Sequence, residues 1–293
     1  MLIHIGLTQE SSIEDYWGSL DTTGSEHIVK KYISRVRFEQ LDRYFRCTEP
    51  WSDDDPTPRS TFDRVDKLAE HIRLTCRKLY NPGTHLAVDE TIERFMGRAP
   101  EIVNIPSKPT PEGFKIWVLA NEGYILDWLW HARGDKAGPV DLDETFTKEE
   151  GFSKTQAVVL DLLTQRDAES NEPLYPPGKH IVWLDNLFTS VKLLTRLRGL
   201  SIRGTGTVRT TKTEREIKGG GEGDILAHAA GRKKVKVAAE QISHRLADLK
   251  LTHAAQIEWG TLYAVTSKDG QVMEFAWKDA NMVLFMSTID DGK

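Results

Sequence analysis

The sequence predicts an α/β protein in which a mixed β-sheet is flanked by helices. The first 80 residues show helical spacing of apolar side chains. The rest follows the order strand, hairpin, helix, strand, helix, strand, which is typical of an α/β layer. Two of the strand candidates end on an aspartate, Asp89 and Asp185, and could lie side by side and parallel.

The composition is that of an ordinary globular protein. Of 293 residues, 39% are hydrophobic and 28% are charged. No apolar run approaches the roughly 18 residues that a membrane helix needs, and the start lacks the pattern of a secretory signal, so no membrane association is expected. With only Cys47 and Cys76, neither a disulfide scaffold nor a cysteine-rich zinc site is expected, and the expected location is intracellular.

The first 80 residues predict a helical region. A helix is expected near residues 11–20, where a serine cap precedes acids in the first turn. Residues 26–47 and 61–80 also show helical spacing, before Asn-Pro-Gly at 81–83 breaks the pattern. The apolar face of the helix over 26–47 would be formed by Ile28, Tyr32, Val36, Leu41 and Phe45.

Strand signals begin after this break. Residues 85–92 form a short apolar run that contains Asp89. Two aromatic-rich runs, 114–120 and 124–132, are joined by Asn-Glu-Gly and predict a β-hairpin. The elements that follow are a serine-capped helix at 153–167, a buried strand at 181–184 before Asp185, a helix at 190–200 and a strand at 201–209.

The last part of the chain is less regular. Residues 210–255 combine a glycine-rich run with a basic stretch, and their structure is ambiguous. Residues 260–279 predict a hairpin, and 281–288 predict one more apolar strand. From Lys192 to Lys250 there are 14 Lys and Arg against 6 Asp and Glu, a local balance of +8 in a chain of net charge −5. This segment is either a phosphate-binding surface or a solvated loop.

The two aspartates are the main candidates for chemistry. If their strands are neighbours, the carboxylates converge at one edge, where divalent cations would relieve their repulsion and support phosphodiester chemistry. The alternative is that each aspartate only caps the turn or helix after its strand. Tryptophans 117, 128, 130 and 183 lie in strands and are interpreted as core, whereas Trp259 and Trp277 could either pack or stack on a base.

Several blocks resemble, in order, those of the piggyBac transposase family. They are Val-Asp-Glu-Thr-Ile-Glu-Arg-Phe-Met-Gly-Arg from residue 88, the stretch 106–127, Trp-Leu-Asp-Asn-Leu-Phe-Thr-Ser from 183, and Gly-Thr-Val-Arg-Thr-Thr-Lys from 206. The helical lead-in and the late run 275–288 are also similar to the family pattern. The resemblance covers most of the chain.

The resemblance implies an RNase H-like core with a helical N-terminal region and a basic, partly β insertion. It also implies an aspartate triad that binds Mg²⁺ or Mn²⁺, whose first two members match the catalytic candidates Asp89 and Asp185. Expected partners are DNA, as transposon ends and TTAA-type targets, and a second copy in a homodimer; the expected location is the nucleus. Candidate phosphate contacts are Arg98, Lys108, Lys115, Arg209 and Lys212.

The chain departs from the family pattern at the third aspartate. The family's Gly-Gly-Val-Asp-like segment has no counterpart after residue 288, so no third catalytic aspartate is expected in the chain, and Asp290 and Asp291 are interpreted as solvated terminal residues. The chain therefore resembles a transposase clipped at both ends. The expected division is a helical region at 1–80, a catalytic core at 81–209, an insertion at 210–278 and a returning strand at 279–293.

The leading hypothesis is a transposase catalytic region that has little strand-transfer activity alone because one ligand is missing. The alternatives are a domesticated or decayed non-catalytic DNA-binding or interaction module, and a stand-alone nuclease in which Asp279, Asp290 or Asp291 supplies the missing carboxylate. An unrelated α/β protein is the fourth hypothesis.

Overall fold

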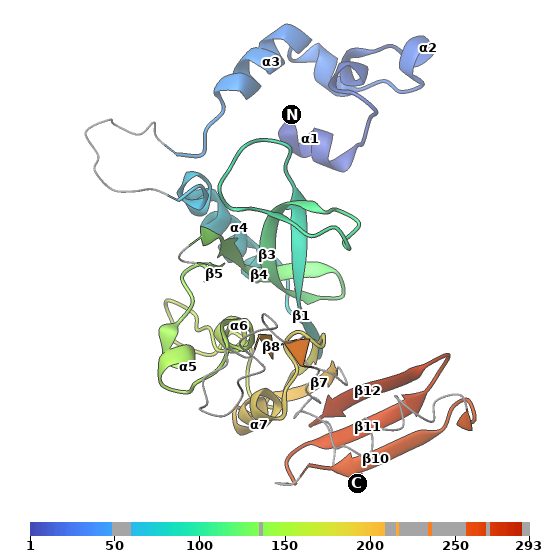
Figure 1. The fold of residues 1–293 in the computed structure, drawn as a ribbon. Helices are drawn as coiled ribbons and strands as arrows, with labels where there is room; N and C mark the ends of the chain where they lie inside the picture. The colour runs from blue at the N-terminus through green and yellow to red at the C-terminus, as the bar shows by residue number, and fades with distance from the viewer. Residues whose placement is uncertain are drawn as a thin grey trace, which may run out of the picture. The chain divides into compact units, whose positions relative to one another are not determined.

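The computed structural model describes residues 1–48, 60–134, 137–208, 215–216, 234–235, 256–267 and 270–288 (Figure 1). The chain divides into two units, Met1–Glu70 and His71–Lys293. Across the described ranges, none of the helices has the length and apolar character needed to cross a membrane.

The first unit consists of helices, as the sequence predicts, but they are shorter than the predicted ones. Its elements are α1 (Leu2–Leu7), η1 (Ile13–Trp17), α2 (Leu20–Thr23), η2 (Ile28–Lys31), α3 (Arg35–Tyr44), η3 (Phe62–Arg64) and the start of α4 (Asp66–Leu79). Ser12 and Asp15 form a capping box at the start of η1, in agreement with the predicted serine cap.

The prediction of one amphipathic helix over residues 26–47 is wrong. The 3₁₀ helix η2 ends at Lys31, and α3 begins only after Ser34, whose hydroxyl accepts a hydrogen bond from the Arg37 amide. Because this cap restarts the helical phase, the buried side chains are Val29 and Phe38. The five side chains of the predicted apolar face are all exposed: Ile28, Tyr32, Val36, Leu41 and Phe45.

The second unit is built on a 10-stranded mixed sheet. Its strands are β1 (His85–Arg94), β2 (Ile102–Asn104), β3 (Glu112–Asn121), β4 (Tyr124–Ala132), β5 (Gly138–Pro139), β6 (Ile181–Leu184), β7 (Arg203–Thr207), β10 (Leu262–Thr266), β11 (Met273–Lys278) and β12 (Met282–Ser287). The spatial order is β10-β11-β12-β7-β6-β1-β3-β4-β5, and β2 pairs with β3. The β1–β6 and β6–β7 pairs are parallel, and the other pairs are antiparallel. A separate short pair joins β8 (Arg215–Glu216) to β9 (Lys234–Val235).

Among the described residues, α5 (Glu144–Lys148), α6 (Lys154–Leu163) and α7 (Val191–Gly199) accompany this sheet, together with the part of α4 that belongs to the second unit. The hydroxyl of Ser153 caps α6 and that of Ser190 caps α7. The buried faces of the helices join strand residues such as Leu86 and Val182 in one hydrophobic core. Figure 1 shows α6 and α7 beside the sheet. The predicted fold class, a mixed sheet flanked by helices, is confirmed.

The predicted hairpin at residues 114–132 is also confirmed. Strands β3 and β4 pair in antiparallel fashion and are joined at Glu122 and Gly123. Both residues have positive φ, 50° and 84°, as a type I′ turn requires. The hairpin therefore follows from the local Asn-Glu-Gly signal.

The two faces of the sheet around β6 differ in burial. Val182 and Leu184 point into the core, whereas Trp183 between them is 45% exposed. The prediction that Trp183 belongs to the core is therefore wrong. The same prediction for Trp117 is confirmed, because that side chain is 4% exposed. The physical reason is the alternation of side chains along a strand, since only one face of β6 meets the helices.

A glycine fixes the close approach of β7 to the connection after β6. A Cβ at Gly206 would lie 2.0 Å from the Thr189 Oγ1 and 2.9 Å from the Leu184 carbonyl oxygen. We therefore expect Gly206→Ala to lower the free energy of unfolding by roughly 1–3 kcal/mol, because the backbone must move to relieve the overlap. Urea unfolding monitored by tryptophan fluorescence measures this change.

Gly199→Ala is the matched control for this prediction. Gly199 is the last residue of α7, and outside its own helix and chain neighbours a Cβ there would meet no described residue within 4 Å. Alanine at this site should be neutral or slightly stabilising, because it favours the helix. Equal stability of Gly206→Ala and the unsubstituted chain would show that β7 can shift at little cost.

Candidate metal and nucleic-acid site

Parallel pairing of β1 with β6 brings the two predicted aspartates together. Ala87 is paired with Trp183 and Val88 with Leu184, and Asp89 and Asp185 follow one residue later on the two strands. The expectation that the first strand ends at Asp89 is wrong, because β1 continues to Arg94 by pairing with β3. Asp89 therefore lies within β1, at the level where its neighbour β6 ends.

The Asp185 carboxylate is held by two neighbours. Its Oδ1 accepts a hydrogen bond of 3.0 Å from the Thr207 hydroxyl of β7 and one of 2.9 Å from the Asn186 side-chain amide. These bonds fix the side chain at the edge of three adjacent strands, β1, β6 and β7. Thr207 and Asn186 were not among the predicted site residues, although both lie within the matching blocks and Asn186 directly follows Asp185.

The Asp89 carboxylate is partly buried among charged groups. Its Oδ1 accepts a hydrogen bond of 2.8 Å from the Glu90 amide. Burial is the main cause that raises the pKa of Asp89, and the negative charges of Glu90 and Asp185 raise it further. The Glu90 amide bond and the positive charge of Lys108 act in the opposite direction. The two aspartates are thus close enough for their charges to interact.

Two carboxylates at one sheet edge suit a magnesium ion, which proteins often hold through one or two carboxylates while water and phosphate oxygens complete its shell. Within the described part of the chain, no group of three His, Cys, Asp or Glu side chains could hold a metal ion. Asp279 follows β11, where its carboxylate accepts a hydrogen bond of 3.2 Å from the Trp259 Nε1. Asp290 and Asp291 lie outside the described residues.

Two of the predicted phosphate contacts have partners within the chain. The Lys108 ammonium lies 3.2 Å from the Glu90 carboxylate. The Lys115 ammonium lies 3.9 Å from the centre of the Trp117 ring, and burial lowers the pKa of this lysine. Arg209 and Lys212 fall outside the described residues.

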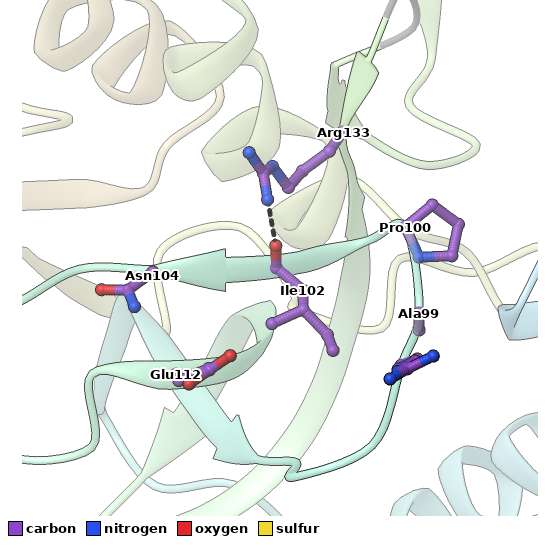
Figure 2. Close-up of a pocket in the computed structure, with 7 residues that line it drawn as sticks. Ala99, Pro100, Ile102, Asn104, Glu112 and Arg133 are labelled. Atoms are coloured by element: carbon purple, nitrogen blue, oxygen red, sulfur yellow. Dashed lines mark hydrogen bonds between the residues drawn. The ribbon is translucent and has the colours of Figure 1, made fainter.

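The fifth predicted contact, Arg98, lines a cavity of about 490 Å³ near the far end of β1. Figure 2 shows that the Arg133 side chain also enters this cavity, where its guanidinium donates a hydrogen bond to the Ile102 carbonyl oxygen. Glu112 contributes one negative charge to the same lining. Arg133 was not among the predicted contacts. It directly follows β4, and the sequence pattern there indicates only an apolar, aromatic strand.

Comparison with known proteins gives consistent matches. A family model described as "Transposase IS4" matches residues 1–293. The human PiggyBac transposable element-derived protein 3 is 26% identical over 189 residues, 64% of this chain and 29% of that protein. The human PiggyBac transposable element-derived protein 2 is 27% identical over 198 residues, again 64% and 29%. The chain thus spans less than a third of the length of these relatives.

A solved structure matches the fold. The piggyBac transposase in a synaptic complex with hairpin DNA superposes with a TM-score of 0.63 at 22% identity, covering 99% of this chain and 50% of that chain. The family model matches residues 1–293, and the mixed sheet agrees with this match, so the chain is transposase-like. It belongs to the Transposase IS4 family, in the piggyBac-type group.

Proposed function

We propose that this chain is the metal-binding and DNA-handling region of a piggyBac-type transposase. The observation that carries the proposal is the parallel pairing of Val88 with Leu184. Asp89 directly follows Val88 and Asp185 directly follows Leu184, so the two aspartates lie side by side. If each aspartate only capped the turn after its own strand, the two strands would not have to be neighbours. The family match and the fold of the structural neighbour support the same function.

In this proposal Asp89 and Asp185 are the catalytic carboxylates and hold Mg²⁺ or Mn²⁺. A divalent cation at such a site activates a water or hydroxyl for attack on a phosphodiester. Thr207 and Asn186 orient the Asp185 carboxylate through their hydrogen bonds, and the Glu90 amide orients that of Asp89. The residues thus pre-arrange two acceptor groups whose repulsion a cation relieves.

DNA is the proposed partner, and transposon ends and TTAA-type targets are the proposed substrates. The structural neighbour was solved with hairpin DNA, which supports this choice. Arg98, Lys108, Lys115, Arg209 and Lys212 are proposed to contact phosphates, and Arg133 is added because it shares a cavity with Arg98. Such contacts give binding that weakens steeply with salt. A nuclear location and a homodimer are part of the same proposal.

The proposed division keeps the predicted boundaries: a helical region at 1–80, a catalytic core at 81–209, an insertion at 210–278 and a returning strand at 279–293.

Because two carboxylates alone hold a cation weakly, we expect the chain by itself to bind Mn²⁺ weakly and to show little strand transfer.

The metal site is tested by measuring Mn²⁺ binding with electron paramagnetic resonance. We expect Asp89→Asn and Asp185→Asn each to weaken binding at least roughly 10-fold, since loss of groups that only orient metal ligands already costs about that much. Asp279→Asn is the control, because its carboxylate is engaged by Trp259. Unchanged affinity in both aspartate variants would refute the site, whereas a loss in the control would identify Asp279 as a further ligand.

A non-catalytic DNA-binding module is the second candidate function. It is favoured by the lack, among the described residues, of a third side chain able to complete a metal site. DNA binding in EDTA that survives Asp89→Asn and Asp185→Asn supports this module. Mg²⁺-dependent cleavage of DNA that both substitutions abolish supports the catalytic assignment instead.

A further inference from the structure

A second cavity opens on the sheet next to Asp185. Its volume is about 520 Å³, and its walls come from β6, β7, β11 and β12. The lining that the described residues form is made of aromatic, aliphatic and hydroxyl-bearing side chains, none of them charged. Six of the lining residues are Trp183, Thr205, Thr207, Phe275, Phe285 and Ser287.

The cavity and the aspartate pair share one face of the sheet. Thr207, which donates a hydrogen bond to the Asp185 carboxylate, is paired with Phe285 of β12, and Phe285 is paired with Phe275 of β11. Residues paired across neighbouring strands point to the same face. The carboxylates, the threonine hydroxyl and the two phenyl rings therefore form one continuous row.

Aromatic rings form the sides of this cavity. Phe275 and Phe285 are stacked with ring centres 4.8 Å apart and an interplanar angle of 13°. Trp183 is 45% exposed, and its Nε1 donates a hydrogen bond of 3.0 Å to the His85 Nδ1, which fixes the indole in place. A large aromatic side chain that is held in position and left half open presents a ready surface for stacking.

Two buried hydroxyl groups also belong to the lining of the cavity. The Thr205 and Ser287 hydroxyls lie 2.7 Å apart and hydrogen-bond to each other. Hydroxyl groups donate as well as accept, so they suit the mixed donor and acceptor edge of a heterocycle. A flat, uncharged group with polar edges would find both stacking and hydrogen-bonding partners in this lining.

We propose that this cavity binds an unpaired nucleobase of the DNA strand whose phosphate lies at Asp89 and Asp185. The inference rests on the proposed function, since it assigns the base next to the phosphate that the aspartate edge would receive. Stacking on aromatic rings is tolerant of base identity. The cavity therefore selects unstacked DNA over regular duplex rather than one sequence over another.

The test uses a single-stranded oligonucleotide that carries 2-aminopurine, a fluorescent purine that is quenched when it stacks. In EDTA, so that metal binding plays no part, we expect the purified chain to quench the probe. Trp183→Ala should lose the quenching and weaken binding roughly 5- to 150-fold, the range typical for one stacked base. Phe285→Leu should also reduce the quenching.

Three controls separate stacking from other effects. Trp183→Phe should retain most of the quenching, because a ring remains. Tyr263→Ala should leave both the quenching and the affinity unchanged, since Tyr263 of β10 is exposed and does not line the cavity. The third control is an oligonucleotide with an abasic site in place of 2-aminopurine. Its affinity for the unsubstituted chain should be no higher than the affinity of the 2-aminopurine strand for Trp183→Ala.

Two outcomes would overturn the inference. Either the probe stays unquenched on the unsubstituted chain, or Trp183→Ala quenches it fully. Either result refutes base stacking in this cavity. Mn²⁺ binding is measured on the same preparation, so a chain that binds Mn²⁺ but does not quench refutes only the base site. A chain that quenches in EDTA but binds no Mn²⁺ refutes only the metal site.

Discussion

Asp127→Ala is expected to lower the free energy of unfolding by about 3–5 kcal/mol, because it leaves a partly buried guanidinium without its counter-charge. Asp127 lies on β4 and is 1% exposed. Its carboxylate accepts a hydrogen bond from the Arg77 guanidinium of α4 and one of 2.7 Å from the Trp128 amide. Arg77 also donates a hydrogen bond of 2.6 Å to the Gln165 side chain. Removing the carboxylate thus disturbs the joint between α4 and the sheet.

An exposed ion pair provides the control for this prediction. Lys148 and Glu144 form an i,i+4 pair on α5 in which both side chains are 70% exposed. Glu144→Ala should change stability by less than about 0.5 kcal/mol, because water and salt screen such pairs. Urea unfolding of both variants gives the comparison. Similar small losses in both would mean that the Asp127 carboxylate is dispensable and that water replaces it.

Asp161→Asn is expected to stabilise the protein at neutral pH by up to about 3 kcal/mol, since one pKa unit corresponds to about 1.4 kcal/mol. Burial raises the pKa of Asp161 to about 6, and the negative charges of Asp143 and Asp127 add to the increase. The carboxyl accepts a hydrogen bond of 3.0 Å from the Asp143 amide, which an asparagine oxygen can also accept. The substitution therefore removes the charge and keeps the acceptor.

The direction in which stability changes with pH follows from the proton affinity of Asp161 in the folded and unfolded states. The folded pKa of Asp161 lies above its unfolded value of 3.8, so the folded state holds the proton more tightly between about pH 4 and pH 6. Stability should fall as pH rises through this window and then level off. Below pH 4 both states are protonated, and the substitution should make little difference.

Thermal unfolding of the unsubstituted chain and of Asp161→Asn at pH 4, 5, 6 and 7 measures this effect. The two melting temperatures should diverge with increasing pH, with the variant higher. Parallel curves across the series would contradict the raised pKa of the Asp161 carboxyl. Asp167→Asn serves as a control of opposite sign, because hydrogen bonds from Ser170 hold the pKa of Asp167 below its usual value.

Elements with a strong local signal were predictable. Ser153 and Ser190 cap helices because a serine side chain accepts from backbone amides within a few residues. The hairpin of β3 and β4 follows from Glu122 and Gly123, which adopt the positive φ that the turn needs. The order of strands and helices in the second unit, and with it the fold class, was also readable from periodicity.

Elements that depend on distant partners were not predictable. Whether Trp183 faces the core or the open side depends on where α6 and α7 pack, not on its own strand pattern. The ion pair of Arg77 with Asp127 joins residues 50 positions apart. In the first unit, Ser34 interrupts a helical pattern that looks continuous, because a cap competes with the apolar spacing on either side.

The amino-acid sequence by itself determined the family, the alternation of strands and helices, and two aspartates beside apolar runs. Only the tertiary structure decided that Asp89 and Asp185 occupy adjacent strands, that Thr207 supports one of them, and that an aromatic cavity continues from them along the same face. The physical reason is that strand neighbours are chosen by the burial and hydrogen bonding of the whole sheet, whereas turns, caps and side-chain alternation are set by a few successive residues.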